Sequence, residues 1–230
     1  MFTYIVALNL IISTYAQQEK VLFSDAISLH LSKYRQNCQD AVNNKDFERV
    51  DRLFDSLVQN HLKGTFLEDL SIRKLSGGFF KTDSLRNPVL LTTTTAWYIK
   101  NDEEIEALNN LASEFNGKID VVVLFWDTKK KVKKAAKPYS KEVIIIYVDE
   151  TLNLENSIIN TYKHALGIPT AFYIGADKKI VSIDRGGLNK FTKARNPELY
   201  AANYEIYHRN MTQLLISDGL LKDTILTGTD

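Results

Sequence analysis

The sequence predicts an α/β fold in which a central sheet, covered by helices on both faces, follows a pair of helices. Three runs are long and apolar enough to form buried strands, at residues 89–95, 120–126 and 143–147. Amphipathic helical patterns separate these runs, an alternation that is typical of sheets buried on both faces. Of the 230 residues, 44% are hydrophobic and 25% are charged, so the chain can build such a core.

A helical hairpin is expected over residues 24–63. In its first half the apolar side chains recur every three or four residues and share one helix face: Ile27, Leu31, Tyr34, Cys38 and Ala41. A second stripe follows an interruption at Asn43 and Asn44: Phe47, Val50, Phe54, Leu57 and Val58. We expect Ser24 or Asp25 to cap the first helix, and the hairpin to end before Gly64.

The pattern changes after Gly64 to that of an α/β body. Gly77 and Gly78 lie between two short apolar segments and predict a small hairpin, and Pro88 precedes the first long strand. The further expected elements are a helix over residues 105–115, a strand at 120–126, a lysine-rich helix, a strand at 143–147, a helix over 153–164, a hairpin of strands at 170–174 and 179–184, and a helix over 197–221.

The N-terminal segment predicts a secretory signal peptide. Residues 1–16 carry no charge, residues 6–12 are mostly apolar, and the small residues Thr14 and Ala16 precede a polar run. No Lys or Arg precedes the apolar stretch, and a buried N-terminal strand is the alternative. The expected organisation is a signal peptide at 1–16, a helical extension at 17–63 and an α/β domain at 64–230, exported to the periplasm or secreted. No other stretch is apolar enough to cross a membrane, so we do not expect an integral membrane protein.

Charge and histidine placement disfavour several classes of function. The 29 Lys and Arg against 28 Asp and Glu give a net charge of +1, which gives no support for nucleic-acid binding. The four histidines are scattered without metal-ligand spacing, and we expect neither a metal nor another cofactor. A basic run spans residues 129–141 and predicts a solvated helix face, with an anionic glycan, lipid or acidic partner as the alternative.

The sequence contains one cysteine, Cys38. This count excludes a disulfide within the chain, a zinc site built from several cysteines, and a Cys-x-x-Cys redox pair. Because Cys38 lies on an apolar helix stripe, we expect it to be a buried packing residue. A regulatory thiol or a disulfide between two chains is the alternative.

Several short motifs follow one another in a distinctive order. Residues 87–91 are Asn-Pro-Val-Leu-Leu, Trp97 precedes a helix, residues 167–170 are Gly-Ile-Pro-Thr, and residues 177–181 are Asp-Lys-Lys-Ile-Val. From Gly64 to about Leu221 the chain resembles the extracytoplasmic thioredoxin-like proteins of the TlpA/ResA and AhpC/TSA redoxin type. The resemblance implies a thioredoxin-like fold, with a mixed sheet between helices, and a redox function. In that family the proline corresponding to Pro169 is cis.

The chain departs from this family at the residues that carry the redox chemistry. The family's Trp-Cys-x-x-Cys falls on residues 97–101, so Tyr98 and Asn101 occupy the two cysteine positions. Thiol–disulfide exchange needs an attacking thiolate and a second thiol, and neither is present there. Asn101 and Glu104 instead form an Asn-x-x-Glu capping pattern, so we expect a stable helix start in place of a redox site.

The resemblance places Trp97 and Tyr98 beside Ile168, Pro169 and Thr170, at adjacent loop ends. These five residues are the predicted binding site for a protein or peptide partner, with the backbone of Ile168 meeting an extended peptide. The expected function is that of an exported thioredoxin-fold protein without catalysis. The alternative is a thiol–disulfide oxidoreductase or antioxidant protein that keeps residual activity through Cys38.

Overall fold

The computed structural model describes residues 20–98, 102–152, 158–185 and 197–219. Its helices are α1 (Phe23–Asn43), α2 (Phe47–Leu57), α3 (Asp102–Glu114), α4 (Lys129–Ala135) and α6 (Pro197–Ser217). Short helical segments are η1 (Val58–Leu62), η2 (Thr82–Ser84), η3 (Glu150–Leu152) and η4 (Ile159–His164). The strands are β1 (Ser71–Lys74), β2 (Phe79–Lys81), β3 (Val89–Thr94), β4 (Asp120–Trp126), β5 (Ile144–Val148), β6 (Thr170–Ile174) and β7 (Ile180–Asp184).

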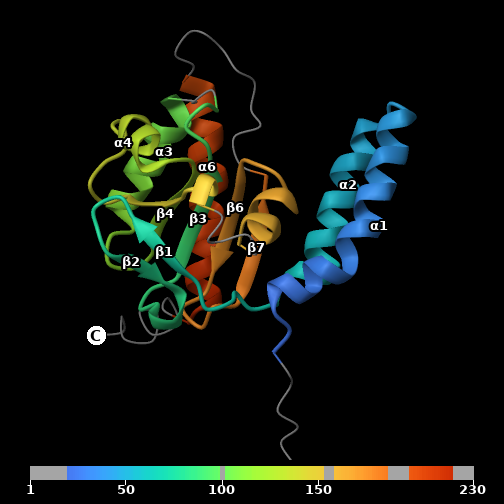
Figure 1. Ribbon diagram of the computed structural model, residues 1–230, viewed down its shortest axis with the longest axis horizontal. Coiled ribbons are helices and arrows are strands. Elements are labelled where there is room, and N and C mark those ends of the chain that lie inside the picture. The colour runs from blue at the N-terminus through green and yellow to red at the C-terminus, as the bar shows by residue number, and fades with distance from the viewer. Residues whose placement is uncertain (1–19, 99–101, 153–157, 186–196, 220–230) are drawn as a thin grey trace, which may run out of the picture.

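These strands form one mixed sheet of seven strands in the order β2-β1-β5-β4-β3-β6-β7 (Figure 1). The central strands β3, β4 and β5 are parallel, whereas β6, β7 and the β1–β2 hairpin are antiparallel to their neighbours. The three parallel strands are the apolar runs that the sequence predicts to be buried. Their carboxyl ends meet at one edge of the sheet, where the β3–α3 loop begins.

Alternate side chains of the central strands enter two separate cores. In β4, Val122, Leu124 and Trp126 face one core, and Val121, Val123 and Phe125 face the other. The first core is closed by α1, α2, η1 and η4, and the second by α3, α4 and α6. Helices therefore cover both faces of the sheet, as the sequence predicts.

The α1–α2 hairpin joins the sheet through its base. Phe23 is fully buried, stacks on Tyr162 of η4 at 5.2 Å between ring centroids, and meets Phe172 of β6 edge to face at 5.6 Å. Backbone hydrogen bonds from Phe23 to Phe66 and from Phe66 to Val21 hold the start of α1 against the following loop. Figure 1 shows that the rest of the pair extends beyond the sheet on its β7 side.

Two expectations for this hairpin were wrong. The N-cap of α1 is Leu22, and Ser24 instead lies in the first turn, where its N–H donates to the Glu68 side chain at 2.6 Å. Cys38 is half-buried, and Phe47 is 65% exposed although it belongs to the predicted apolar stripe. Both residues lie toward the free end of the pair, where each helix has one neighbour and no sheet to complete its burial.

The other elements lie close to their predicted positions. The predicted signal peptide at 1–16 and the beginning of the predicted helix over 153–164 lie outside the described residues. In the described part of the chain, no helix is long and apolar enough to span a membrane.

Candidate functional site

The candidate site lies where β3 ends and α3 begins. Residues 95–98 leave the sheet at the carboxyl edge of the parallel strands, and α3 starts at Asp102. Asn101, which occupies one of the two former cysteine positions, lies outside the described residues together with residues 99 and 100. Its predicted capping role therefore stays a prediction.

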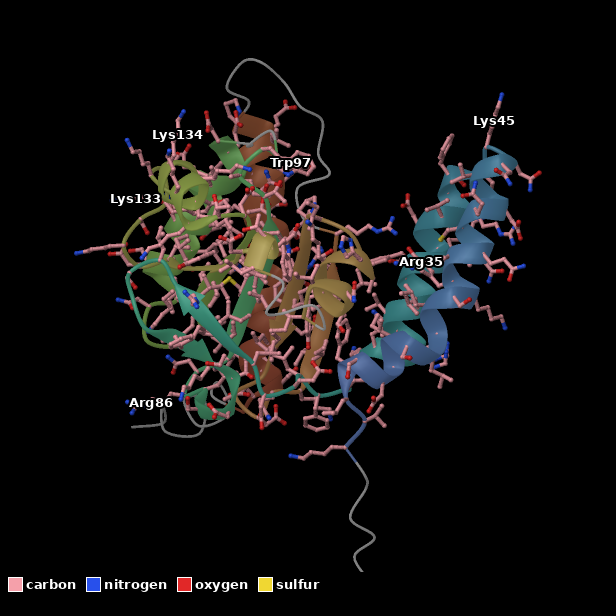
Figure 2. The ribbon with its side chains drawn as sticks, viewed as in Figure 1. Arg35, Lys45, Arg86, Trp97, Lys133 and Lys134 are labelled. Carbon is pink, nitrogen blue, oxygen red and sulfur yellow. The ribbon has the colours of Figure 1, made fainter. Side chains whose placement is uncertain are left out.

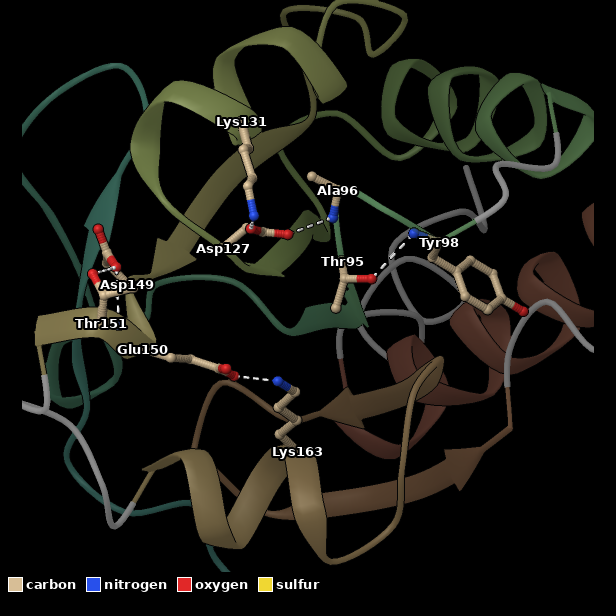
Figure 3. Close-up of polar contacts among 9 residues, drawn as sticks. All are labelled: Thr95, Ala96, Tyr98, Asp127, Lys131, Asp149, Glu150, Thr151 and Lys163. Atoms are coloured by element: carbon tan, nitrogen blue, oxygen red, sulfur yellow. Dashed lines mark hydrogen bonds and ion pairs between the residues drawn. The ribbon is translucent and has the colours of Figure 1, made fainter.

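Hydrogen bonds hold residues 95–98 after β3 in place (Figure 3). The Tyr98 N–H donates to the hydroxyl of Thr95 at 3.2 Å, and the Ala96 N–H donates to the carboxylate of Asp127 at 3.0 Å. The same carboxylate pairs with the Lys131 ammonium of α4 at 2.9 Å. Because Asp127 is only 8% exposed, it acts as a buried link between the loop, the end of β4 and α4.

A small cavity lies beneath the loop. It is lined by Thr92, Thr93, Thr94, Tyr98, Glu104, Leu108, Tyr139, Pro169, Thr170 and Tyr207, and has a volume of about 20 Å³. A space of that size holds about one water molecule. A partner larger than a water molecule must therefore bind on the surface beside Tyr98, because the space is too small to hold it.

A carboxyl group and several phenols surround this cavity. Glu104 of α3 accepts a hydrogen bond of 2.7 Å from the Tyr207 hydroxyl of α6. Loss of solvent raises the pKa of Glu104, and the hydrogen bond from Tyr207 only partly opposes this effect. Burial, and then the nearby Glu104, also raise the pKa of Tyr98, which makes its phenolate still less available at neutral pH.

The turn before β6 supplies the second wall of the site. The Ile168–Pro169 peptide bond is cis. Thr170 is fully buried, and its N–H donates to the Thr93 hydroxyl of β3 at 3.2 Å. An ion pair between Lys163 and Glu150 holds the preceding η4 segment against η3 (Figure 3).

Ile168 differs from its neighbours because its main chain is unpaired. Within the described ranges, its N–H and carbonyl have no hydrogen-bond partner, and the residue lies outside every strand and helix. The residue is half-buried, and its unpaired main chain leaves one donor and one acceptor without a partner among the described residues.

The structure brings together three of the five predicted binding residues. Tyr98, Pro169 and Thr170 line one cavity, whereas Trp97 and Ile168 are not among its lining residues. Trp97 is 71% exposed and Tyr98 is half-buried, so the aromatic pair divides into one surface residue and one residue packed against the cavity.

Sequence reasoning did not single out Asp127, Tyr139 or Tyr207 for this site. Asp127 follows a predicted buried strand directly, and a carboxylate at that position is a signal for the loop contact it makes. Tyr207 carries no such signal, because α6 reaches the site from more than a hundred residues along the chain.

Cys38 lies on a different part of the molecule. It is on α1, which Figure 1 shows separated from α3 by β6 and β7. Burial raises the pKa of the neighbouring Tyr34 to about 12, and the Arg185 guanidinium, which donates to its hydroxyl, partly opposes this rise. The site and the single thiol are therefore on separate elements.

Two of the histidines, which are far apart in the sequence, lie together in the structure. His30 of α1 and His61 of η1 stack with ring centroids 3.7 Å apart. Among the described residues, no group of three or more His, Cys, Asp or Glu side chains is placed to hold a metal ion.

Solved structures are similar to this chain, and the similarity lies in the fold. No family model matches the sequence, and neither does any curated protein. Solved structures do match. One is a protein of Chlorobium tepidum assigned as the thiol:disulfide interchange protein DsbE; it is 17% identical, with a TM-score of 0.51, over 66% of this chain and 97% of that one.

The chain has a thioredoxin-like fold. A thioredoxin domain of a Bacteroides vulgatus thiol-disulfide oxidoreductase also matches, at 16% identity and a TM-score of 0.47, over 63% of this chain and 96% of that one. At these identities the similarity concerns the fold, and the function has to be argued from the site.

Proposed function

We propose that this chain is an exported thioredoxin-fold protein that binds a protein or peptide partner and does not catalyse thiol–disulfide exchange. It would consist of a helical extension at residues 17–63 and a thioredoxin-like domain at 64–230, preceded by a signal peptide at 1–16. The uncharged, mostly apolar N-terminal segment supports export.

The residues at the former redox positions support a role without catalysis. Tyr98 has a raised pKa and no thiol partner, so it is a poor nucleophile at neutral pH. The first turn of α3 carries Asp102, Glu103 and Glu104. Negative side chains at a helix N-terminus offset the positive end of the dipole, which in a redox protein would stabilise a thiolate.

The unpaired main chain of Ile168 is the observation that supports binding most directly. A partner in extended conformation could add to this turn through backbone hydrogen bonds, with its side chains reaching Trp97. An exposed tryptophan is the residue type most often found to dominate the affinity of an interface. The cavity beside Tyr98 is too small to hold a side chain of the partner, so the partner would lie on the surface.

The alternative function rests on Cys38 alone. A residual oxidoreductase would have to use a half-buried thiol on α1, without a second thiol in this chain to resolve a mixed disulfide. The thiol also lies away from the β3–α3 loop, so the binding site and the reactive group would not act together.

A permanently unfolded probe tests the proposed binding. Fluorescein-labelled, reduced and carboxymethylated α-lactalbumin presents extended segments without free thiols, and fluorescence anisotropy measures its affinity. Trp97→Ala is expected to weaken binding about tenfold or more, as for a central interface tryptophan. Phe79→Ala is the matched control, because Phe79 is 53% exposed but lies on the edge strand β2, which is separated from β3 by β1, β5 and β4. Equal losses in both variants, or no binding by the unaltered chain, would contradict the proposal.

A further inference from the structure

A set of lysines forms one exposed face on α4 and the turn after it. We define the lysine face as Lys129, Lys130, Lys133, Lys134 and Lys137, all of which are exposed. Val132, Ala135 and Ala136 of the same segment are buried in the core that α3 and α6 also cover. The buried side holds the helix in place, so the lysines point outward, as Figure 2 shows for Lys133 and Lys134.

The charge of the lysine face is not neutralised within the described part of the chain. The ion pairs on this segment involve its other lysines: Lys131 with Asp127, and Lys141 with Glu142 at 4.0 Å. The chain as a whole carries +1, so the positive field is local to this face. The segment contains lysine and no arginine, which suits attraction to a diffuse negative surface better than paired hydrogen bonds to a single phosphate.

An exposed tryptophan follows a residue that is linked to the start of α4. Trp97 follows Ala96, whose N–H is bound by the same Asp127 carboxylate that pairs with Lys131 at the start of α4. Figure 2 shows Trp97 and Lys134 at the same end of the body. Tryptophan is enriched at the level of lipid headgroups, whereas a dissolved acidic polymer would need only the charges.

We propose that the lysine face and Trp97 dock on the surface of a membrane that contains anionic lipids. The lysines supply attraction to the headgroups, and the indole of Trp97 enters the interfacial layer. The lysines lie along one exposed side of a helix, and such a surface fits a flat partner. This docking goes beyond partner binding at Ile168 and does not depend on it.

Vesicle binding by the full chain tests this proposal. Vesicles of phosphatidylglycerol and phosphatidylcholine at a 1:3 ratio are compared with phosphatidylcholine vesicles, whose binding is subtracted as the part that needs no anionic lipid. Changing the five lysines of the face to Gln is expected to lower the anionic part of the partition coefficient by at least about tenfold. Raising the salt to 0.5 M should lower it similarly for the unaltered chain.

A second variant shows whether binding depends on the lysine face or only on the net charge of the chain. Five other exposed lysines, Lys33, Lys45, Lys63, Lys81 and Lys118, are changed to Gln, which removes the same amount of charge. This variant is expected to keep most of the binding. Circular dichroism and the fluorescence of Trp126, which is 2% exposed, show whether each variant is folded.

The emission of Trp97 gives an independent result. Its fluorescence should move to shorter wavelength on anionic vesicles, and Trp97→Phe should abolish that shift, because the other tryptophan is already buried. Equal loss in the two lysine variants, or absence of the Trp97 shift, would overturn the proposal. Binding to poly-glutamate that depends on the lysine face, without binding to vesicles, would also overturn it and assign the face to an acidic polymer. None of these results changes the partner-binding test, which uses the unfolded probe without vesicles and leaves the lysines untouched.

Discussion

The buried carboxylate of Asp127 allows a test of what holds residues 95–98 against the end of β4: its hydrogen bond to Ala96 or its ion pair with Lys131. In Asp127→Ala, the Ala96 N–H loses its acceptor at a position that is only partly open to water, and Lys131 loses its partner. If the hydrogen bond to Ala96 dominates, most of the stability lost in Asp127→Ala comes from losing that bond. If the attraction between charges dominates, most of the lost stability comes from losing the ion pair with Lys131.

The two contributions differ in size. A hydrogen bond to a charged acceptor contributes about 1.5–3 kcal/mol. The Lys131 side chain is 64% exposed, so its ion pair contributes about 1 kcal/mol or less. Asp127→Ala is therefore expected to lower the free energy of unfolding by about 2–3 kcal/mol, and the midpoint of thermal unfolding by roughly 4–12 °C.

Urea unfolding followed through Trp126 measures this change, because Trp126 is buried directly before Asp127. Lys131→Met removes the ion pair alone and is expected to cost no more than about 1 kcal/mol. Asp127→Asn, which keeps an acceptor oxygen, should fall between the two. A loss in Asp127→Ala no larger than that in Lys131→Met would refute the assignment of the loop to this hydrogen bond.

Three further predictions follow from other contacts. Burial raises the pKa of Glu104 above its ordinary 4.5. The unfolded chain therefore releases this proton at a lower pH than the folded chain does. As the pH rises from 4.5 through the raised pKa, the folded chain loses the stability that the protonated carboxyl contributes. Relative to the unaltered chain, Glu104→Gln should therefore gain stability between pH 4.5 and neutral pH, as measured by urea unfolding; a constant difference would contradict this. Phe23→Ala should lower the free energy of unfolding by about 3–5 kcal/mol, against about 0.5 kcal/mol or less for Leu29→Ala, which is 75% exposed on the same helix. With dithiothreitol as reductant, insulin reduction should proceed at the uncatalysed rate with the unaltered chain and with Cys38→Ser; faster turnover that the substitution abolishes would restore the oxidoreductase alternative.

Most of the fold could be predicted because its central strands are buried on both faces. The run from Val121 to Phe125 needs apolar residues at every position, and such a run is visible without knowledge of its neighbours. Which residues of the α1–α2 hairpin are buried was harder to predict. Its helical period is clear at Phe47 as much as at Phe54, but only the residues near the sheet gain a second surface, so Phe54 is buried and Phe47 is not.

The motifs in the sequence predict where the candidate site lies, but they do not predict the side-chain contacts that form it. Trp97, Tyr98 and Pro169 mark the two loops by position along the chain. The contacts that shape the site come from Asp127 and Tyr207, which lie on other elements. Asp127 has a sequence signal, because it directly follows a buried strand, but Tyr207 has none. Long-range side-chain contacts of this kind depend on how the layers pack.

The sequence by itself determined the α/β class, the order of the elements and the absence of a second cysteine in this chain, because these depend on local pattern and residue identity. Only the tertiary structure decided that Tyr98 lines a small cavity, that the main chain of Ile168 is unpaired, and that the loop carrying Trp97 is linked to the start of α4 through Asp127. Each of these depends on which surfaces meet when the sheet and helices pack together. Burial and hydrogen-bond pairing are properties of that packed arrangement, and residue order alone does not specify them.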